Sequence, residues 1–181
     1  MGRICVFAGS SAGKDPSFVR VAAQLGAELA RRGIGLVFGA GRVGLMGAMA
    51  DAALGASGEV IGVIPRAMVE REWAHQDLSQ LHVVADMHER KALMNQLADA
   101  FLALPGGIGT LEELFEVYTW AQLGFHHKPV ALLDVHGYYG PLLSMLDAMV
   151  DAGFLGREAR ALLHCDDDAS RLLDALSTAL A

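Results

Sequence analysis

Residues 105–113, with the sequence PGGIGTLEE, combine a glycine-rich loop with a carboxylate. Gly106, Gly107 and Gly109 lack Cβ atoms, so backbone amides can approach an anion closely, and a helix that follows would point its free N–H groups at that anion. Glu113 lies about one turn inside this expected helix. A carboxylate hinders the binding of an anion, but it can activate water or stabilise a positive charge. The segment therefore predicts an anion-binding loop that carries a catalytic side chain.

Basic residues occur earlier in the chain, in residues 87–91, whose sequence is MHERK. Arg90 offers a planar, permanently charged fork of donors and Lys91 a compact ammonium group, and both suit a phosphate or an anionic ribose. Taken alone, the segment is an ordinary helix start with surface charges. We interpret His88 as a local hydrogen-bonding residue. None of the seven histidines has the spacing of a zinc-ligand pair, so we expect no metal.

Glu113 also has a purely structural explanation. Residues 110–113 match a capping box, in which Thr110 caps the helix and the Glu113 side chain turns back to the Thr110 amide. The two roles are compatible. Glu116 and Thr119 follow along a similar helix face, where they could extend a pocket inward.

Short β-rich runs alternate with longer amphipathic segments, the pattern of a parallel sheet covered by helices. The expected strands cover residues 3–8, 34–38, 60–64, 81–85, 100–104 and 130–135. The expected helices cover residues 16–32, 45–56, 87–98, 110–123 and 141–152, with a last helix from about Asp168, which caps it after a solvated acidic turn at residues 166–168. No linker or repeat divides the chain, so residues 1–181 predict one Rossmann-like α/β domain, a doubly wound parallel sheet with helices on both faces.

Segments with unusual glycine and charge content all follow expected strands. They are residues 8–14, 39–47, 65–66, 87–91 and 105–110. Doubly wound sheets bind ligands beyond the carboxyl ends of their strands. We therefore expect these five loops to converge on one ligand site.

Two familiar nucleotide motifs are incomplete. Residues 39–44, GAGRVG, satisfy the dinucleotide fingerprint, but the next strand ends in VIPR, without the acidic residue that holds a ribose hydroxyl. A nicotinamide cofactor is therefore not expected. Residues 9–15 are one residue short of a Walker A loop and carry Asp15 where a magnesium-binding Ser or Thr belongs. ATP hydrolysis is not supported.

Composition narrows the function classes further. With 53% hydrophobic and 19% charged residues, the 181 residues supply ample material for a buried core. The formal net charge of −7 argues against general affinity for nucleic acid or anionic membrane, so an anionic ligand must be captured locally. Only Cys5 and Cys165 occur, and no secretory or membrane-length apolar stretch is present. We expect a cytoplasmic enzyme without a disulfide framework.

Residues 87–94, MHERKALM, and residues 105–113 closely resemble paired signatures of the LONELY GUY family of cytokinin-activating phosphoribohydrolases. The similarity continues through residues 119–124 and 44–47 and covers essentially the whole chain. It implies hydrolysis of the N-glycosidic bond of an N6-substituted adenosine 5′-monophosphate, a cytokinin riboside 5′-monophosphate, to free base and ribose 5-phosphate without a cofactor. Older labels of this family as lysine decarboxylases fit poorly, because nothing in the sequence suggests a pyridoxal phosphate lysine.

The resemblance also assigns roles by position. Arg90 and Glu113 fall on the family's catalytic pair. The expected substrate contacts combine the family's nucleotide-contacting positions with the glycine-rich loops: Gly9, Ser10, Gly44, Met46, Glu72, Arg90, Lys91, Gly106, Gly107, Ile108, Gly109, Thr110, Leu111, Glu112, Glu113 and Thr119. Glu113 would stabilise the positive charge that develops on the ribose and align the attacking water, and Arg90 would hold the phosphate or ribose. No general acid for the departing base is assigned.

Departures from the family pattern concern substrate preference rather than the reaction. Ala40 and Arg42 stand in a loop that is a run of glycines and Ser in many relatives, and Ala8 stands where Cys is common. Two other functions stay open, a nucleotide or molybdenum-cofactor carrier without hydrolase activity and a general AMP nucleosidase. The presence of both Arg90 and Glu113 favours the enzyme. Shorter members of the family are typically homodimers, and the helix at residues 110–123 is rich in apolar side chains, so we expect a homodimer. We expect no nucleic-acid or membrane partner.

Overall fold

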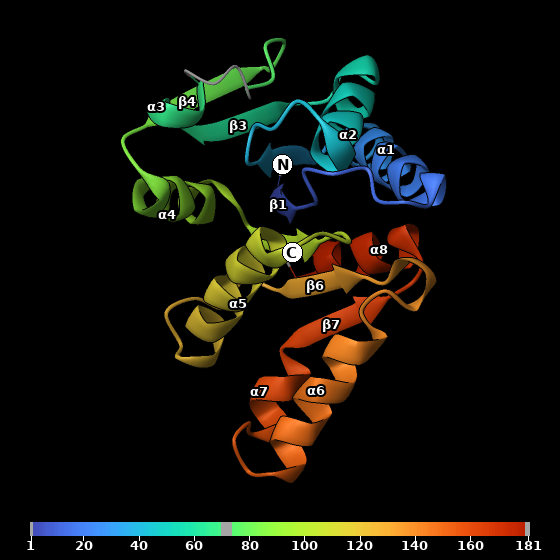
Figure 1. The fold of residues 1–181 in the computed structure, drawn as a ribbon, viewed down its shortest axis with the longest axis vertical. Coiled ribbons are helices and arrows are strands. Elements are labelled where there is room, and N and C mark those ends of the chain that lie inside the picture. The colour runs from blue at the N-terminus through green and yellow to red at the C-terminus, as the bar shows by residue number, and fades with distance from the viewer. Residues whose placement is uncertain (1, 70–73, 180–181) are drawn as a thin grey trace.

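The computed structural model describes residues 2–69 and 74–179 (Figure 1). Seven parallel strands form one sheet in the order β4-β3-β2-β1-β5-β6-β7. The strands are β1 Arg3–Phe7, β2 Gly35–Phe38, β3 Val60–Pro65, β4 Gln80–Val84, β5 Ala100–Ala103, β6 Val130–Leu133 and β7 Leu163–Asp166. The helices are α1 Pro16–Arg31, α2 Gly44–Gly55, α3 Arg66–Val69, α4 Met87–Leu97, α5 Ile108–Gln122, α6 Gly140–Asp151, α7 Arg157–Ala161 and α8 Ala169–Ala179, with a 3-10 turn η1 at Val135–Gly137.

This arrangement confirms the predicted doubly wound α/β fold. The chain starts in the middle of the sheet, adds β2, β3 and β4 outward on one side, and then returns to place β5 on the free side of β1. Strand order therefore reverses between β1 and β5. Ligands of such sheets bind beyond the carboxyl ends of the strands at this reversal, which fixes where a site is expected.

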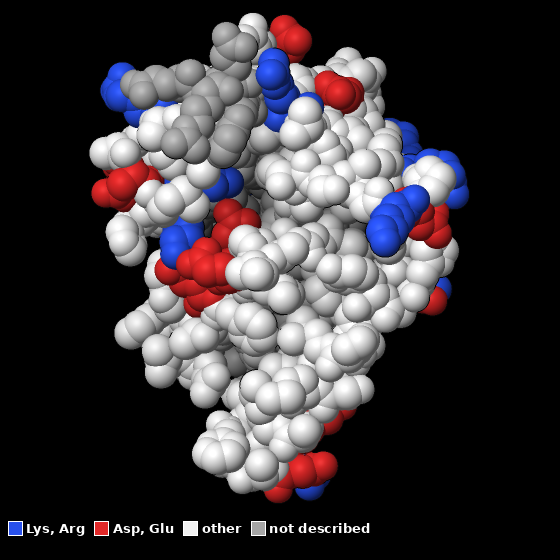
Figure 2. Space-filling view, in the orientation of Figure 1, with Lys and Arg blue, Asp and Glu red and all other residues white. Residues whose placement is uncertain are grey.

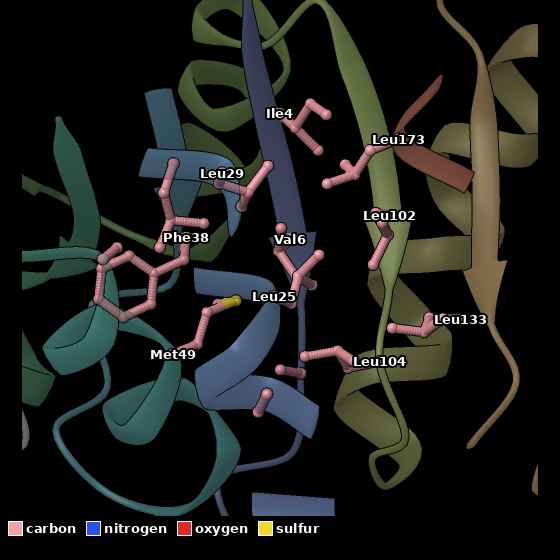
Figure 3. Close-up of a cluster of buried hydrophobic side chains, with 14 of the residues drawn as sticks. Ile4, Val6, Leu25, Leu29, Phe38, Met49, Leu102, Leu104, Leu133 and Leu173 are labelled. Atoms are coloured by element: carbon pink, nitrogen blue, oxygen red, sulfur yellow. The ribbon is translucent and has the colours of Figure 1, made fainter. Parts of the chain in front are cut away.

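Helices cover both faces of the sheet because successive strand residues point to opposite sides. Ile4 and Val6 of β1 pack with α1, α2 and α8, whereas Cys5 and Phe7 pack with α4, α5 and α6. Figure 3 shows the first of these clusters, with Leu25 of α1 beside the sheet. The short, continuously apolar strands are buried on both faces, as strands of a covered parallel sheet are.

The sequence-based boundaries hold to within two residues for the six expected strands and six expected helices, whereas α3, α7, η1 and β7 were not expected. The acidic turn at residues 166–168 is partly wrong, because Asp166 is the last residue of β7 and pairs with β6. Pairing with a neighbouring strand overrides the turn preference of a local acidic run. The cap is confirmed, since the Asp168 carboxylate accepts a hydrogen bond from the Arg171 amide at 2.8 Å.

The capping box at residues 110–113 is also wrong. Helix α5 begins two residues earlier than expected, with extended Gly107 as its N-cap and no side-chain hydrogen bond at that cap. Thr110 is therefore the third helical residue, and Glu113 lies in the second turn, out of reach of the helix start. Within residues 2–69 and 74–179, no helix has the length and apolar character needed to cross a membrane.

Candidate active site

A cleft of about 750 Å³ opens at the carboxyl ends of β1, β2, β3 and β5. This volume falls in the range of small-molecule sites. Its lining includes residues from every one of these strand ends and from α4: Ala8, Ser10, Gly39, Gly41, Arg42, Val43, Met46, Ile64, Met68, Met87, Arg90, Gly107, Ile108, Gly109, Thr110, Glu112 and Glu113. Four of the five segments expected to converge contribute to this lining, whereas residues 65–66 do not, although Ile64 and Met68 on either side of them do.

The β5–α5 loop presents unsatisfied donors to this cleft. Among the described residues, the amides of residues 107–110 donate to no hydrogen bond, because they belong to the N-cap and first turn of α5. A Cβ on Gly106 would overlap the Thr110 hydroxyl, so only glycine allows this close turn. Since the helix dipole adds positive potential at the same place, the loop can accept a phosphate or another anion.

Gly9 joins the loops of β1, β5 and β2. Its amide donates to the Pro105 carbonyl at 3.1 Å, and its carbonyl accepts from the Leu45 amide at 3.0 Å. Gly44, at φ +66°, packs so closely on Ser10 that a Cβ would overlap the Ser10 backbone. These two glycines therefore act by bringing the loops together, and neither lines the cleft itself.

Arg90 enters the cleft from a firmly capped helix. Asp86 caps α4 by accepting from the His88 and Glu89 amides at 2.8 and 2.9 Å. The Arg90 guanidinium lies against Gly39, where a Cβ would overlap Nη2, and donates to the Gly39 carbonyl at 3.3 Å. Its buried Nε has no partner among the described residues. Because Arg90 lines the cleft, its guanidinium can bind an anionic group of a ligand.

Glu113 faces Arg90 inside the cleft. Its Oε1 lies 3.5 Å from Arg90 Nη2, and the two side chains are only 13% and 9% exposed. Burial raises the pKa of Glu113 to about 7, and Arg90 opposes this rise while Glu112 adds to it. A carboxyl with a pKa near neutrality can exchange a proton at physiological pH, which is unusual for a glutamate and typical of catalytic groups.

Lys91 is held by carboxylates instead of facing the cleft. Its ammonium pairs with Glu112 at 2.5 Å and with Glu116 at 3.0 Å, and the bond to Glu112 raises the pKa of Lys91. Lys91, Glu113 and Glu116 line a separate cavity of about 10 Å³, the size of one water molecule. Figure 2 shows basic and acidic side chains side by side between α4 and α5, next to a hollow.

The structure therefore groups most, though not all, of the expected site residues. The cleft brings together Ser10, Met46, Arg90, Gly107, Ile108, Gly109, Thr110, Glu112 and Glu113. Gly9, Gly44, Gly106 and Leu111 lie in the loops and helix behind that lining. Lys91 borders the smaller cavity, and Thr119 is exposed further along α5, outside both linings. Glu72 lies outside the described residues.

The predicted contact residues omit several residues that build the cleft, although Gly39 and Met87 lie in segments that were expected to reach the site. Gly39 gives space to Arg90, and its place at the end of β2 was the available signal. Ile64, Met68 and Met87 supply an apolar part of the lining. Ile64 and Met68 were not predicted, because an isolated hydrophobic residue gives no signal of a binding role. Among the described residues, no three His, Cys, Asp or Glu side chains are grouped as a metal site would require.

Comparison with known proteins gives a consistent family assignment. The family model described as possible lysine decarboxylase matches residues 46–176. The chain is 53% identical over 171 residues to cytokinin riboside 5′-monophosphate phosphoribohydrolase LOG7 of Arabidopsis thaliana, covering 94% of this chain and 79% of that protein. It is 51% identical over 161 residues to the enzyme LOG of Oryza sativa subsp. japonica, covering 89% and 66%.

Solved structures support the fold. The molybdenum cofactor carrier protein of Chlamydomonas reinhardtii superposes with a TM-score of 0.75 at 22% identity, covering 99% of this chain and 98% of that chain. The molybdenum cofactor binding protein of Rippkaea orientalis gives 0.74 at 21% identity, with the same coverage. At such identities the likeness extends to the fold alone.

Proposed function

Because the chain belongs to the LONELY GUY family of cytokinin riboside 5′-monophosphate phosphoribohydrolases, we propose that it hydrolyses the N-glycosidic bond of N6-modified adenosine 5′-monophosphates. The products are the free cytokinin base and ribose 5-phosphate. The observation that carries this function is the buried Arg90–Glu113 pair beside an anion-binding helix start. The same pair favours the enzyme over a carrier that only holds a nucleotide, because a buried carboxyl of raised pKa in a cleft is a common feature of catalytic sites.

The 5′-phosphate occupies the loop between β5 and α5. Free amides of residues 107–110 and the positive end of the α5 dipole suit its charge. Binding energy from this nonreacting group holds the ribose in register, so that its anomeric carbon stays next to the reacting side chains.

Glu113 acts on the ribose. Departure of the purine leaves positive charge on the sugar ring, and a nearby carboxylate stabilises that charge and aligns or deprotonates the attacking water. Desolvation keeps the carboxylate reactive, since little water competes for it.

Arg90 acts on both Glu113 and the substrate. Its guanidinium lies 3.5 Å from Glu113 and opposes the rise in the pKa of that carboxyl, which keeps part of it ionised near pH 7. Arg90 also lines the cleft, where its guanidinium suits an oxygen of the ribose or phosphate. The proton that the departing base requires has no assigned donor.

A substrate panel tests the function. The protein is incubated with N6-isopentenyladenosine 5′-monophosphate, AMP and N6-isopentenyladenosine, and released base is measured by chromatography. We expect base from the N6-modified monophosphate, with the riboside much poorer because it lacks the anchoring phosphate. Plain adenine at equal efficiency would indicate a general AMP nucleosidase. No base from any adenylate despite tight binding would indicate a carrier.

We further propose a homodimer in the cytoplasm. Large apolar side chains stand exposed on or just after α5, α6 and α7: Leu123, Phe125, Met145, Phe154 and Leu162. The surface over these helices carries few charged side chains in Figure 2, and a second copy would cover it. The free thiols of Cys5 and Cys165 suit a reducing compartment. Light scattering after gel filtration tests the dimer, with the mass of one chain as the contradicting result.

A further inference from the structure

Tyr138 follows β6, and its side chain reaches the glycine-rich loop after β5. Its hydroxyl donates a hydrogen bond to the Gly106 carbonyl at 2.5 Å. The adjacent Tyr139 donates to the Leu104 carbonyl at 2.6 Å. Two neighbouring tyrosines therefore hold the β5–α5 loop at points two residues apart, although neither lines the cleft.

The bond to Gly106 determines the direction of the next amide. In a trans peptide, the C=O of one residue and the N–H of the following residue point in opposite directions. The described residues contain no cis peptide bond, so the Gly107 N–H points away from Tyr138. Gly107 lines the cleft, and its N–H has no partner among the described residues.

This peptide needs an external restraint. Gly106 and Gly107 both lack a Cβ, so the plane between them can rotate more freely than in other residues. The preceding carbonyl, that of Pro105, is already held by the Gly9 amide at 3.1 Å. Tyr138 supplies the corresponding restraint one residue later.

The Tyr138 ring is itself held in place without a ligand. It packs edge-on against Phe18 and Tyr139, with ring centroids 5.9 and 5.1 Å away. Before it, His136 and Gly137 adopt positive φ of +58° and +72°, which turns the chain back toward β5. A left-handed histidine is strained, and its ring nitrogen lies 2.9 Å from the Ser17 hydroxyl, which ties the turn to α1.

We propose that Tyr138 is a positioning residue, whose hydroxyl orients the Gly106–Gly107 peptide so that the Gly107 amide donates to the anionic group of the ligand. The inference rests on the proposed function in taking this group to be the 5′-phosphate. Tyr138 does not touch the reacting atoms. Its effect is therefore specific to ligands that carry a phosphate.

The test is Tyr138→Phe, which keeps the ring and its packing and removes the hydroxyl. For the loss of one neutral hydrogen bond, we expect about a three- to tenfold increase in KM for N6-isopentenyladenosine 5′-monophosphate and in Kd for ribose 5-phosphate, with kcat changed by less than about twofold. Calorimetric Kd for the free base, N6-isopentenyladenine, stays unchanged. The matched control is Tyr118→Phe, whose hydroxyl donates to the Ala159 carbonyl at 2.9 Å and joins α5 to α7, and it leaves all these constants unchanged.

Two results would overturn the inference. One is wild-type affinity of Tyr138→Phe for ribose 5-phosphate. The other is an equal loss for ribose 5-phosphate and for the free base, which indicates general disorder of the site. If the wild-type protein releases no base but Tyr138→Phe still weakens ribose 5-phosphate selectively, the proposed function fails and the positioning role stands.

Discussion

Replacing Glu113 by Gln is expected to stabilise the protein while removing its activity. Burial raises the pKa of this carboxyl from its ordinary value of 4.5 to about 7, so the folded protein loses stability when Glu113 ionises. At 1.36 kcal/mol for each pKa unit, the full effect is about 3 kcal/mol. Gln resembles the protonated carboxyl and avoids this loss.

The size of this stabilisation depends on pH. A raised folded-state pKa means that wild-type stability is retained below pH 4.5 and lost as the pH rises toward about 7. Glu113→Gln should therefore exceed the wild type by less than about 1 kcal/mol at pH 5 and by about 3 kcal/mol at pH 8. Turnover should fall by at least about 10²-fold, because the reacting carboxylate is gone.

Urea denaturation at both pH values and a base-release assay on the same samples measure these quantities. The matched control is Glu116→Gln, one turn along α5, which removes a carboxylate paired with Lys91 at 3.0 Å and so lowers stability by up to about 1 kcal/mol. If Glu113→Gln is less stable than the wild type at pH 8, or keeps its turnover, the reasoning about a desolvated catalytic carboxylate is refuted.

Three further results are expected. In the wild type, kcat/KM should fall about tenfold for each pH unit below about 7 and level off above it, because only ionised Glu113 is active; a flat profile between pH 5 and 8 would contradict this. Arg90→Gln should lower turnover by about 10²-fold and move the midpoint of the pH profile upward, since Arg90 opposes the rise in the pKa of Glu113. An unchanged midpoint in a rate–pH titration would argue against this coupling between Arg90 and Glu113. Gly39→Ala should reduce kcat/KM, because a Cβ there displaces the Arg90 guanidinium, while circular dichroism should show that the fold is retained. The control Gly55→Ala should leave kcat/KM unchanged, because a Cβ at that position meets open space.

Periodicity and the rules of parallel sheets predicted the fold and the sheet edge at which the cleft lies. The strands and main helices could be found because each is a short apolar run or an amphipathic segment, and the loops converge because parallel strands end at one edge. The start of α5 could not be found, since TLEE fits a capping box at a helix start as well as it fits the third to sixth positions of a helix. Strand β7 was missed because its acidic end resembles a turn and only pairing with β6 makes it a strand.

The contacts that tune the site depend on tertiary structure. The space at Gly39 for Arg90 joins residues 51 positions apart, and the Tyr138 bond to Gly106 joins residues 32 apart. No local pattern encodes either contact. The raised pKa of Glu113 likewise follows from burial, which the sequence indicates only through the fold.

The position of the substrate is best determined by a crystal structure of Glu113→Gln with N6-isopentenyladenosine 5′-monophosphate bound, because this variant holds the substrate uncleaved. We expect the phosphate on the amides of residues 107–110 and the side chain of residue 113 facing the anomeric carbon or its attacking water, with reacting atoms about 3 to 3.5 Å apart. A phosphate bound elsewhere, or a side chain at residue 113 turned away from the sugar, would contradict this expectation.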